Sequence, residues 1–197
     1  MGHAPENTIA SFQKALDLAA DEVETDVWLT QDGRLLVTHD RPTAETTLTL
    51  DEVLDFCRGR MAVNVELKSD KDEARARETG AAVAARLAAR GRGDFYISSF
   101  WWSALEGART AVPAVRRAFL FSDSPDRAAL LASAKTQGLW ALHPERMYVT
   151  PELIKAAHAA SLRVNPWTVN DPKEIATFRN WSVDGIMSDF PERVPKE

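Results

Sequence analysis

Two carboxylates stand two residues apart in the segment Val23–Val27, as Glu24 and Asp26. On a β-strand, residues at this spacing project to the same face, so the two negative charges would repel each other. If that face is buried, a bound cation, a basic partner or protonation must compensate the charges. If the face is exposed, an ordinary surface ion pair would explain the pair equally well.

A second polar face follows in Met61–Lys68, where Asn64, Glu66 and Lys68 alternate with apolar residues. Neighbouring strands of a parallel barrel bring their carboxyl ends together. Glu24, Asp26 and Glu66 could therefore converge on one hard divalent cation, which prefers oxygen ligands. Lys68 would then place a positive charge beside the cation, suited to a phosphate oxygen.

Histidine and tryptophan supply the remaining candidates for chemistry. His39 directly follows a short apolar run, in a position from which a loop could place it as a general acid or base, although a lone histidine is often structural. Trp167 falls near the end of a candidate strand and could either wall a pocket or pack in the core. His143 and His158 carry weaker signals, and the single cysteine, Cys57, is expected to be buried and inert.

Short β-rich runs alternate with longer helical runs along the whole chain, the pattern of parallel strands joined by helices. Helix starts are predicted at Asn7 or Thr8, at Thr49 with Glu52 as a capping box, and at Thr150, and an outer helix is predicted over Glu73–Arg92. The candidate strands are Val23–Leu29, Met61–Lys68, Phe95–Ser98, Arg117–Phe121, Leu139–His143, Arg163–Thr168 and Gly185–Ser188, with a shorter one at Leu35–Thr38.

These elements predict an α/β fold, a TIM barrel formed as one domain by residues 1–197. Seven strand–helix units are one short of a closed barrel. An open barrel would leave backbone hydrogen-bonding groups unpaired at its edges, so we expect a first strand ahead of Met1. The length of 197 residues is also below the roughly 250 residues of a typical barrel of this kind.

Composition excludes several classes of protein. The 24 Lys and Arg residues against 29 Asp and Glu residues include no basic run, which argues against a nucleic-acid partner. No apolar stretch approaches the roughly 18 residues of a membrane span, and the start lacks the regions of a signal peptide. A cytoplasmic protein is therefore expected.

Several short motifs stand in a fixed order along the chain. The motifs are Ala4-Pro5-Glu6-Asn7-Thr8, Glu24-Thr25-Asp26-Val27, Thr30-Gln31-Asp32-Gly33, His39-Asp40, Asn64-Val65-Glu66-Leu67-Lys68, Ser98-Ser99-Phe100, Trp167-Thr168-Val169-Asn170 and Val183-Asp184-Gly185-Ile186-Met187-Ser188-Asp189-Phe190-Pro191. Each is weak alone, and the ordered set is specific. Together the motifs resemble the glycerophosphodiester phosphodiesterase family, especially its short bacterial, cytosolic members.

The resemblance implies a phospholipase-C-like (β/α)8 barrel with a Mg²⁺ or Ca²⁺ site formed by Glu24, Asp26 and Glu66. It implies that His39 is one of two catalytic histidines and that Lys68 and Trp167 lie on the substrate side. The implied reaction is the hydrolysis of a small-molecule glycerophosphodiester to glycerol 3-phosphate and an alcohol. The alcohol and the oligomeric state stay open.

Two departures from the family pattern keep other functions in consideration. The His-Arg-Gly motif that ends the family's first strand is absent and would lie before Met1, and the insertion after His39 is shortened to Arg41–Leu48. The first departure is compatible with a catalytically silent barrel that binds metal and phosphate. The second, which predicts an open site, is compatible with a lysophospholipase D-type activity on larger lipids.

Overall fold

The computed structural model describes residues 2–91 and 93–196, and the backbone contacts group them into two compact units. The first unit holds residues 3–116 without residue 92, and the second holds residues 117–196 with Gly2. Each unit is described by itself, and a single domain over residues 1–197 stays a prediction.

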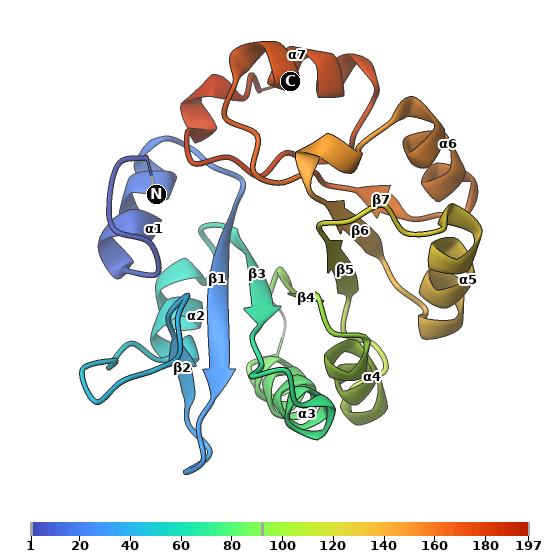
Figure 1. Ribbon diagram of the computed structural model, residues 1–197. Helices are drawn as coiled ribbons and strands as arrows, with labels where there is room; N and C mark the ends of the chain where they lie inside the picture. The colour runs from blue at the N-terminus through green and yellow to red at the C-terminus, as the bar shows by residue number, and fades with distance from the viewer. Residues whose placement is uncertain (1, 92, 197) are drawn as a thin grey trace. The chain divides into compact units, whose positions relative to one another are not determined.

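The first unit contains a four-stranded sheet in the order β2-β1-β3-β4. Strands β1, β3 and β4 are parallel, and β2 is antiparallel to β1. In Figure 1, β1 is the long blue arrow and β3 runs beside it. The elements are α1 (Ile9–Asp17), β1 (Glu22–Leu29), β2 (Leu35–Val37), α2 (Leu50–Cys57), β3 (Ala62–Leu67), α3 (Glu73–Ala89), β4 (Phe95–Ser99) and α4 (Trp102–Ala111).

The second unit continues the alternation of strands and helices, with β5, β6 and β7 parallel in that order. Its elements are β5 (Arg117–Phe121), α5 (Arg127–Gln137), β6 (Ala141–Pro144), the 3-10 turn η1 (Arg146–Tyr148), α6 (Pro151–Ala159), β7 (Arg163–Val164), α7 (Pro172–Asn180) and the 3-10 turn η2 (Pro191–Arg193).

Helix starts follow the predicted capping signals. The Thr8 side chain caps α1, and Thr49 and Glu52 form the capping box of α2. Thr150 caps α6, with Pro151 at its first position. A side-chain oxygen at each start accepts a backbone N–H that the helix itself cannot satisfy, which fixes where the helix begins.

The crossing of α3 and α4 depends on two glycines. A Cβ atom at Gly80 would lie 1.9 Å from the carbonyl oxygen of Ala104, and one at Gly107 would lie 2.1 Å from that of Arg77. The two backbones are therefore in direct contact, and only glycine permits this approach. The predicted end of α3 at Arg92 lies outside the described residues, because residue 92 is not described; the helix itself ends at Ala89.

Cys57, the single cysteine of the sequence, lies at the end of α2 with no exposed surface. Burial raises the pKa of its thiol to about 11. The prediction of a buried cysteine is confirmed, and a thiol with so little thiolate at neutral pH is chemically inert.

Of two strand predictions, one was too long and one was wrong. The predicted strand Arg163–Thr168 is a regular strand only over Arg163–Val164. Beyond it, Asn165 N and Trp167 N still donate to the carbonyls of Leu142 and Pro144, at 3.0 and 3.1 Å. Pro166 has no N–H to give to the segment on its other side. The predicted strand Gly185–Ser188 is not a strand. Isolated hydrogen bonds, such as that from Met187 N to the Pro166 carbonyl at 3.0 Å, connect it to the segment Arg163–Thr168. The Asp184 carboxylate accepts from Val164 N at 2.8 Å, where a ladder would use a carbonyl.

Smaller differences concern strand ends and direction. The strand predicted at Leu139–His143 runs from Ala141 to Pro144. The short run at Leu35 forms a hairpin with β1, closed by a turn in which Gly33 has a φ of 84°. The prediction of a strand ahead of Met1 concerns residues outside the printed sequence and stays a prediction.

Candidate metal and catalytic site

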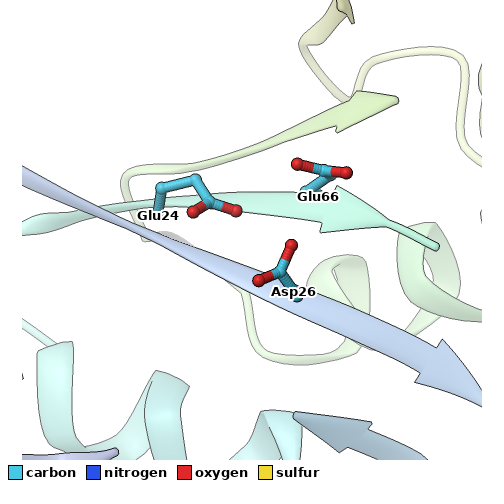
Figure 2. Close-up of side chains that lie close together, drawn as sticks. All are labelled: Glu24, Asp26 and Glu66. Carbon is cyan, nitrogen blue, oxygen red and sulfur yellow. The ribbon is translucent and has the colours of Figure 1, made fainter. Parts of the chain in front are cut away.

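Three carboxyl groups meet on one face of the paired strands β1 and β3. Asp26 on β1 is the register partner of Glu66 on β3, and Glu24 precedes Asp26 by two residues on the same face. One oxygen from each group lies within 4.8 Å of the others, and Figure 2 shows the three groups close together on the paired strands. The structure thus brings together Glu24, Asp26 and Glu66, the set that strand spacing predicts.

Lys68 follows β3 directly and contacts two of these carboxylates. Its Nζ lies 2.9 Å from Asp26 Oδ1 and 2.5 Å from Glu66 Oε1. Burial alone would lower the pKa of Lys68, but the charges of Glu66 and Asp26 outweigh it and hold this pKa above its ordinary value. The lysine therefore stays charged at the edge of the cluster.

The carboxylates resist simultaneous ionisation. Although Glu24 as a residue is exposed, loss of hydration at its carboxyl group and then repulsion from Asp26 and Glu66 raise its pKa well above the ordinary value. Burial also raises the pKa of Glu66, and Lys68 only partly offsets that effect. Three ionised carboxylates against one ammonium leave two negative charges, a balance that suits a divalent cation.

The side-chain amide of Asn64, beside the carboxylates, also fits such a cation. Asn64, the register partner of Glu24, is buried, and within the described residues neither end of its amide has a hydrogen-bond partner. A buried unpaired amide is costly and fits a site that binds a polar group or ion. Because the three carboxylates and the Asn64 carbonyl group all offer oxygen ligands, the site suits Mg²⁺ or Ca²⁺ better than metals that prefer sulfur or imidazole.

His39 lies two residues beyond the hairpin strand β2. It lines an open pocket of about 300 Å³ together with Glu6, Asn7, Asp40, Thr46 and Thr47. Its side chain is 57% exposed, and its Nδ1 is 3.2 Å from Asp40 Oδ1. His39 is close enough to the cluster that its positive charge would lower the pKa of Glu66. A histidine accessible to solvent and substrate can transfer protons.

Asn7 touches the cluster, a role that the sequence interpretation missed by treating it only as a helix start. It lies in the left-handed region with a φ of 54°, and its Nδ2 donates to Asp26 Oδ2 at 2.7 Å. The signal in the sequence is a repeated spacing: the pair Thr25-Asp26 follows Asn7 at the distance at which Ser188-Asp189 follows Asn170.

Trp167, the other predicted substrate residue, lies in the second unit. Its indole N–H donates to the carbonyl oxygen of His143 at 2.8 Å, which holds the ring in orientation. Burial lowers the pKa of His143 to about 3, so this histidine is neutral, and its Nε2 is 3.2 Å from the amide nitrogen of Asn165. His158 is at the surface, 2.9 Å from Asp184.

Across the described part of the chain, no helix has the length and apolar character needed to cross a membrane. Location in the cytoplasm stays a prediction.

Comparisons with known proteins extend over nearly the whole chain. The model of the glycerophosphoryl diester phosphodiesterase family matches residues 1–58 and 41–193. A glycerophosphodiester phosphodiesterase of Bacillus altitudinis is 29% identical over 241 residues, which cover 99% of this chain and 93% of that protein. One of Caldanaerobacter subterraneus is 28% identical over 225 residues, covering 96% and 90%.

Among solved structures, a phosphodiesterase of Oleispira antarctica in complex with the product sn-glycerol 3-phosphate has a TM-score of 0.87 at 25% identity, covering 98% of this chain and 91% of that one. This likeness confirms the prediction of an α/β fold of the barrel type found in these phosphodiesterases. With a family model that matches most of its length, the chain belongs to the glycerophosphoryl diester phosphodiesterase family.

Proposed function

We propose that this protein is a metal-dependent phosphodiesterase that hydrolyses glycerophosphodiesters to glycerol 3-phosphate and an alcohol. The observation that carries the proposal is the cluster of Glu24, Asp26 and Glu66, with Lys68 in contact with two of its members. Membership of the family supports hydrolysis of a phosphodiester. The product bound to the Oleispira antarctica protein supports glycerol 3-phosphate as the phosphate-containing product.

In this proposal the three carboxylates hold one Mg²⁺ or Ca²⁺ ion. When bound, the ion supplies positive charge that neutralises phosphate oxygens as negative charge builds up in the transition state. Lys68 supplies a second positive charge from the protein itself, fixed in place by Asp26 and Glu66. Because these groups are already oriented, little reorganisation is needed during the reaction.

His39 is the proposed proton-transfer residue. With the Nδ1 proton directed to Asp40, the neutral ring presents Nε2 as a base, and after protonation as an acid. As the new phosphorus–oxygen bond forms, a proton must leave the nucleophile, and as the bond to the alcohol breaks, a proton must reach the leaving oxygen. His39 performs one of these transfers, and the family resemblance assigns the other to a second histidine.

Trp167 is proposed to contact the substrate through a ring face. Since its indole N–H already donates to the His143 carbonyl, the side chain is held in orientation and offers an apolar surface. Such a surface suits the carbon skeleton of glycerol and adds no competing hydrogen bond.

The test is release of glycerol 3-phosphate from glycerophosphocholine in the presence of Mg²⁺, Ca²⁺ or EDTA. We expect turnover that requires the cation and is lost in Glu66→Gln, while Glu106→Gln, at an exposed ion pair on α4, serves as the control and retains it. Binding of cation and glycerol 3-phosphate without turnover would instead support the silent barrel. A strong preference for lysophosphatidylcholine would support the lysophospholipase D-type activity.

A further inference from the structure

Asn7 makes three hydrogen bonds to Thr25 and Asp26, in the middle of strand β1. Its Nδ2 donates to Asp26 Oδ2 at 2.7 Å, and its Oδ1 accepts from Thr25 Oγ1 at 2.9 Å and from Asp26 N at 3.0 Å. We name Asn7, Thr25 and Asp26 the N-terminal clamp. With Asp26 Oδ1 at 2.9 Å from Lys68 Nζ, each oxygen of this carboxylate has a fixed partner.

The orientation of Asp26 is therefore determined from two sides. Asn7 fixes Oδ2 on the side of the loop before α1, and Lys68 contacts Oδ1 on the side of β3. A carboxylate with both oxygens held cannot rotate about its Cβ–Cγ bond without breaking a hydrogen bond or an ion pair. A ligand oxygen pre-oriented in this way binds a cation with a smaller loss of conformational freedom.

The second unit contains the same arrangement without a carboxylate cluster among its described residues. Asn170 Nδ2 donates to Asp189 Oδ2 at 2.7 Å, and its Oδ1 accepts from Ser188 Oγ at 3.0 Å and from Asp189 N at 2.9 Å. We name these three residues the C-terminal clamp. The separations along the chain, 18 and 19 residues, are the same in both clamps.

The shared geometry separates two contributions of the asparagine. Both clamps connect the start of a helix, capped by Thr8 or Asp171, to the segment that follows it, so both stabilise the fold locally. Only the N-terminal clamp holds an aspartate that belongs to the carboxylate cluster. The C-terminal clamp is therefore a matched internal control for the structural contribution.

We propose that Asn7 is a positioning residue for the phosphodiesterase site, which acts by holding the Asp26 carboxylate in its cation-binding orientation. This inference rests on the proposed function. It assigns to Asn7 no contact with the reacting atoms. Loss of an outer partner of a metal ligand typically lowers metal affinity roughly 10- to 100-fold, and we expect an effect of this size at Asn7.

The test compares Asn7→Gly with Asn170→Gly. Glycine removes the side chain and accepts the left-handed backbone of Asn7, so no strain is added. Affinity for Mg²⁺ and Ca²⁺ is measured by isothermal titration calorimetry, and stability by thermal unfolding in EDTA. We expect both variants to melt earlier, and only Asn7→Gly to lose cation affinity, roughly 10- to 100-fold.

A milder pair keeps the inference testable if Asn7→Gly does not fold. Thr25→Val and Ser188→Ala each remove one hydroxyl donor to the asparagine, and we expect a smaller loss of cation affinity in Thr25→Val alone. Equal affinities in the two members of each pair would overturn the positioning role while leaving the proposed function in place. Failure of the unsubstituted protein to bind either cation would contradict the metal site of the proposed function and the positioning role with it.

Discussion

The N-terminal and C-terminal clamps have the same hydrogen bonds around an aspartate, yet the two aspartates have different neighbours. Two residues before Asp26 stands Glu24, whereas two residues before Asp189 stands Met187. Asp26 also lies on an eight-residue strand that pairs with neighbours on both sides, while the segment before Asp189 forms no strand. The clamp is thus a device for holding a loop, a helix and a following segment together. A metal site arises where a second carboxylate on the strand and the residues of β3 are added to it.

The comparison is tested most strongly by two exposed histidines, His39 in the first unit and His158 in the second. His39→Ala should lower the rate roughly 10²- to 10⁴-fold with little change in cation affinity, because it removes a proton-transfer group and no metal ligand. His158→Ala, which removes a partner of Asp184, should leave the rate unchanged and cost no more than about 1 kcal/mol of stability. Steady-state kinetics of both variants measure the difference, and equal losses would remove His39 from the mechanism.

The two clamped aspartates give the next largest effect. Asp26→Asn should lower Mg²⁺ or Ca²⁺ affinity by at least about 100-fold, beyond the range for an outer partner, because a charged ligand is lost. Asp189→Asn should leave cation affinity unchanged. Calorimetric titration of the two variants decides the point, and a comparable loss in Asp189→Asn would contradict the assignment of the metal site to Glu24, Asp26 and Glu66.

The second unit should also respond to pH through His143. Because the pKa of this histidine is about 3 when folded and about 6.5 when unfolded, its neutral form stabilises the protein fully above pH 6.5. The unfolded state takes up the proton first, so stability falls as the pH decreases from 6.5 towards 3, by about 2 kcal/mol at pH 5.

Denaturant unfolding at pH 7 and pH 5 in EDTA measures this loss, with His143→Gln as the comparison. The variant lacks the proton that His143 takes up on unfolding, so its stability should depend less on pH between pH 7 and pH 5. The raised pKa values of Glu24 and Glu66 act in the opposite direction, so the difference between the two proteins isolates His143. Identical profiles would contradict the lowered pKa, because they would mean that His143 takes up its proton over the same pH range in the folded and unfolded states.

The smallest effect concerns the caps of the two helices that follow the clamp asparagines. Thr8 accepts from Ser11 N, and Asp171 accepts from Lys173 N at 2.8 Å. Thr8→Ala and Asp171→Ala should each lower the free energy of unfolding by about 1 kcal/mol, the usual cost of a lost cap. Thermal unfolding in EDTA checks whether the two costs agree, and a much larger cost at Thr8 would mean that the two segments are not equivalent.

Much of this architecture could be predicted because the deciding signals are local. Alternating polar residues in the segments around Glu24 and Glu66 determine which side chains share a face, and parallel pairing then brings them together. Threonines at helix starts likewise carry their own capping chemistry. The ordered motifs identified the family for the same reason, since each consists of a few consecutive residues.

Other features depend on contacts that the sequence pattern does not contain. The segment Gly185–Ser188 has the composition of a strand, but Pro166 and the Asp184 carboxylate interrupt the pairing on which a strand depends. The role of Asn7 rests on a contact with a residue 19 positions away, and it becomes visible in the sequence only when the spacing at Asn170 is compared with it.

The buried thiol of Cys57 has a practical consequence for measurements on this protein. Since the single native cysteine is inaccessible and its pKa is about 11, thiol-directed fluorophores or spin labels should not react with the folded chain at neutral pH. A cysteine introduced at an exposed position such as Met147 would be labelled alone. The native sequence thus serves as a silent background for spectroscopy, with no need to remove its own cysteine and create a cavity at the end of α2.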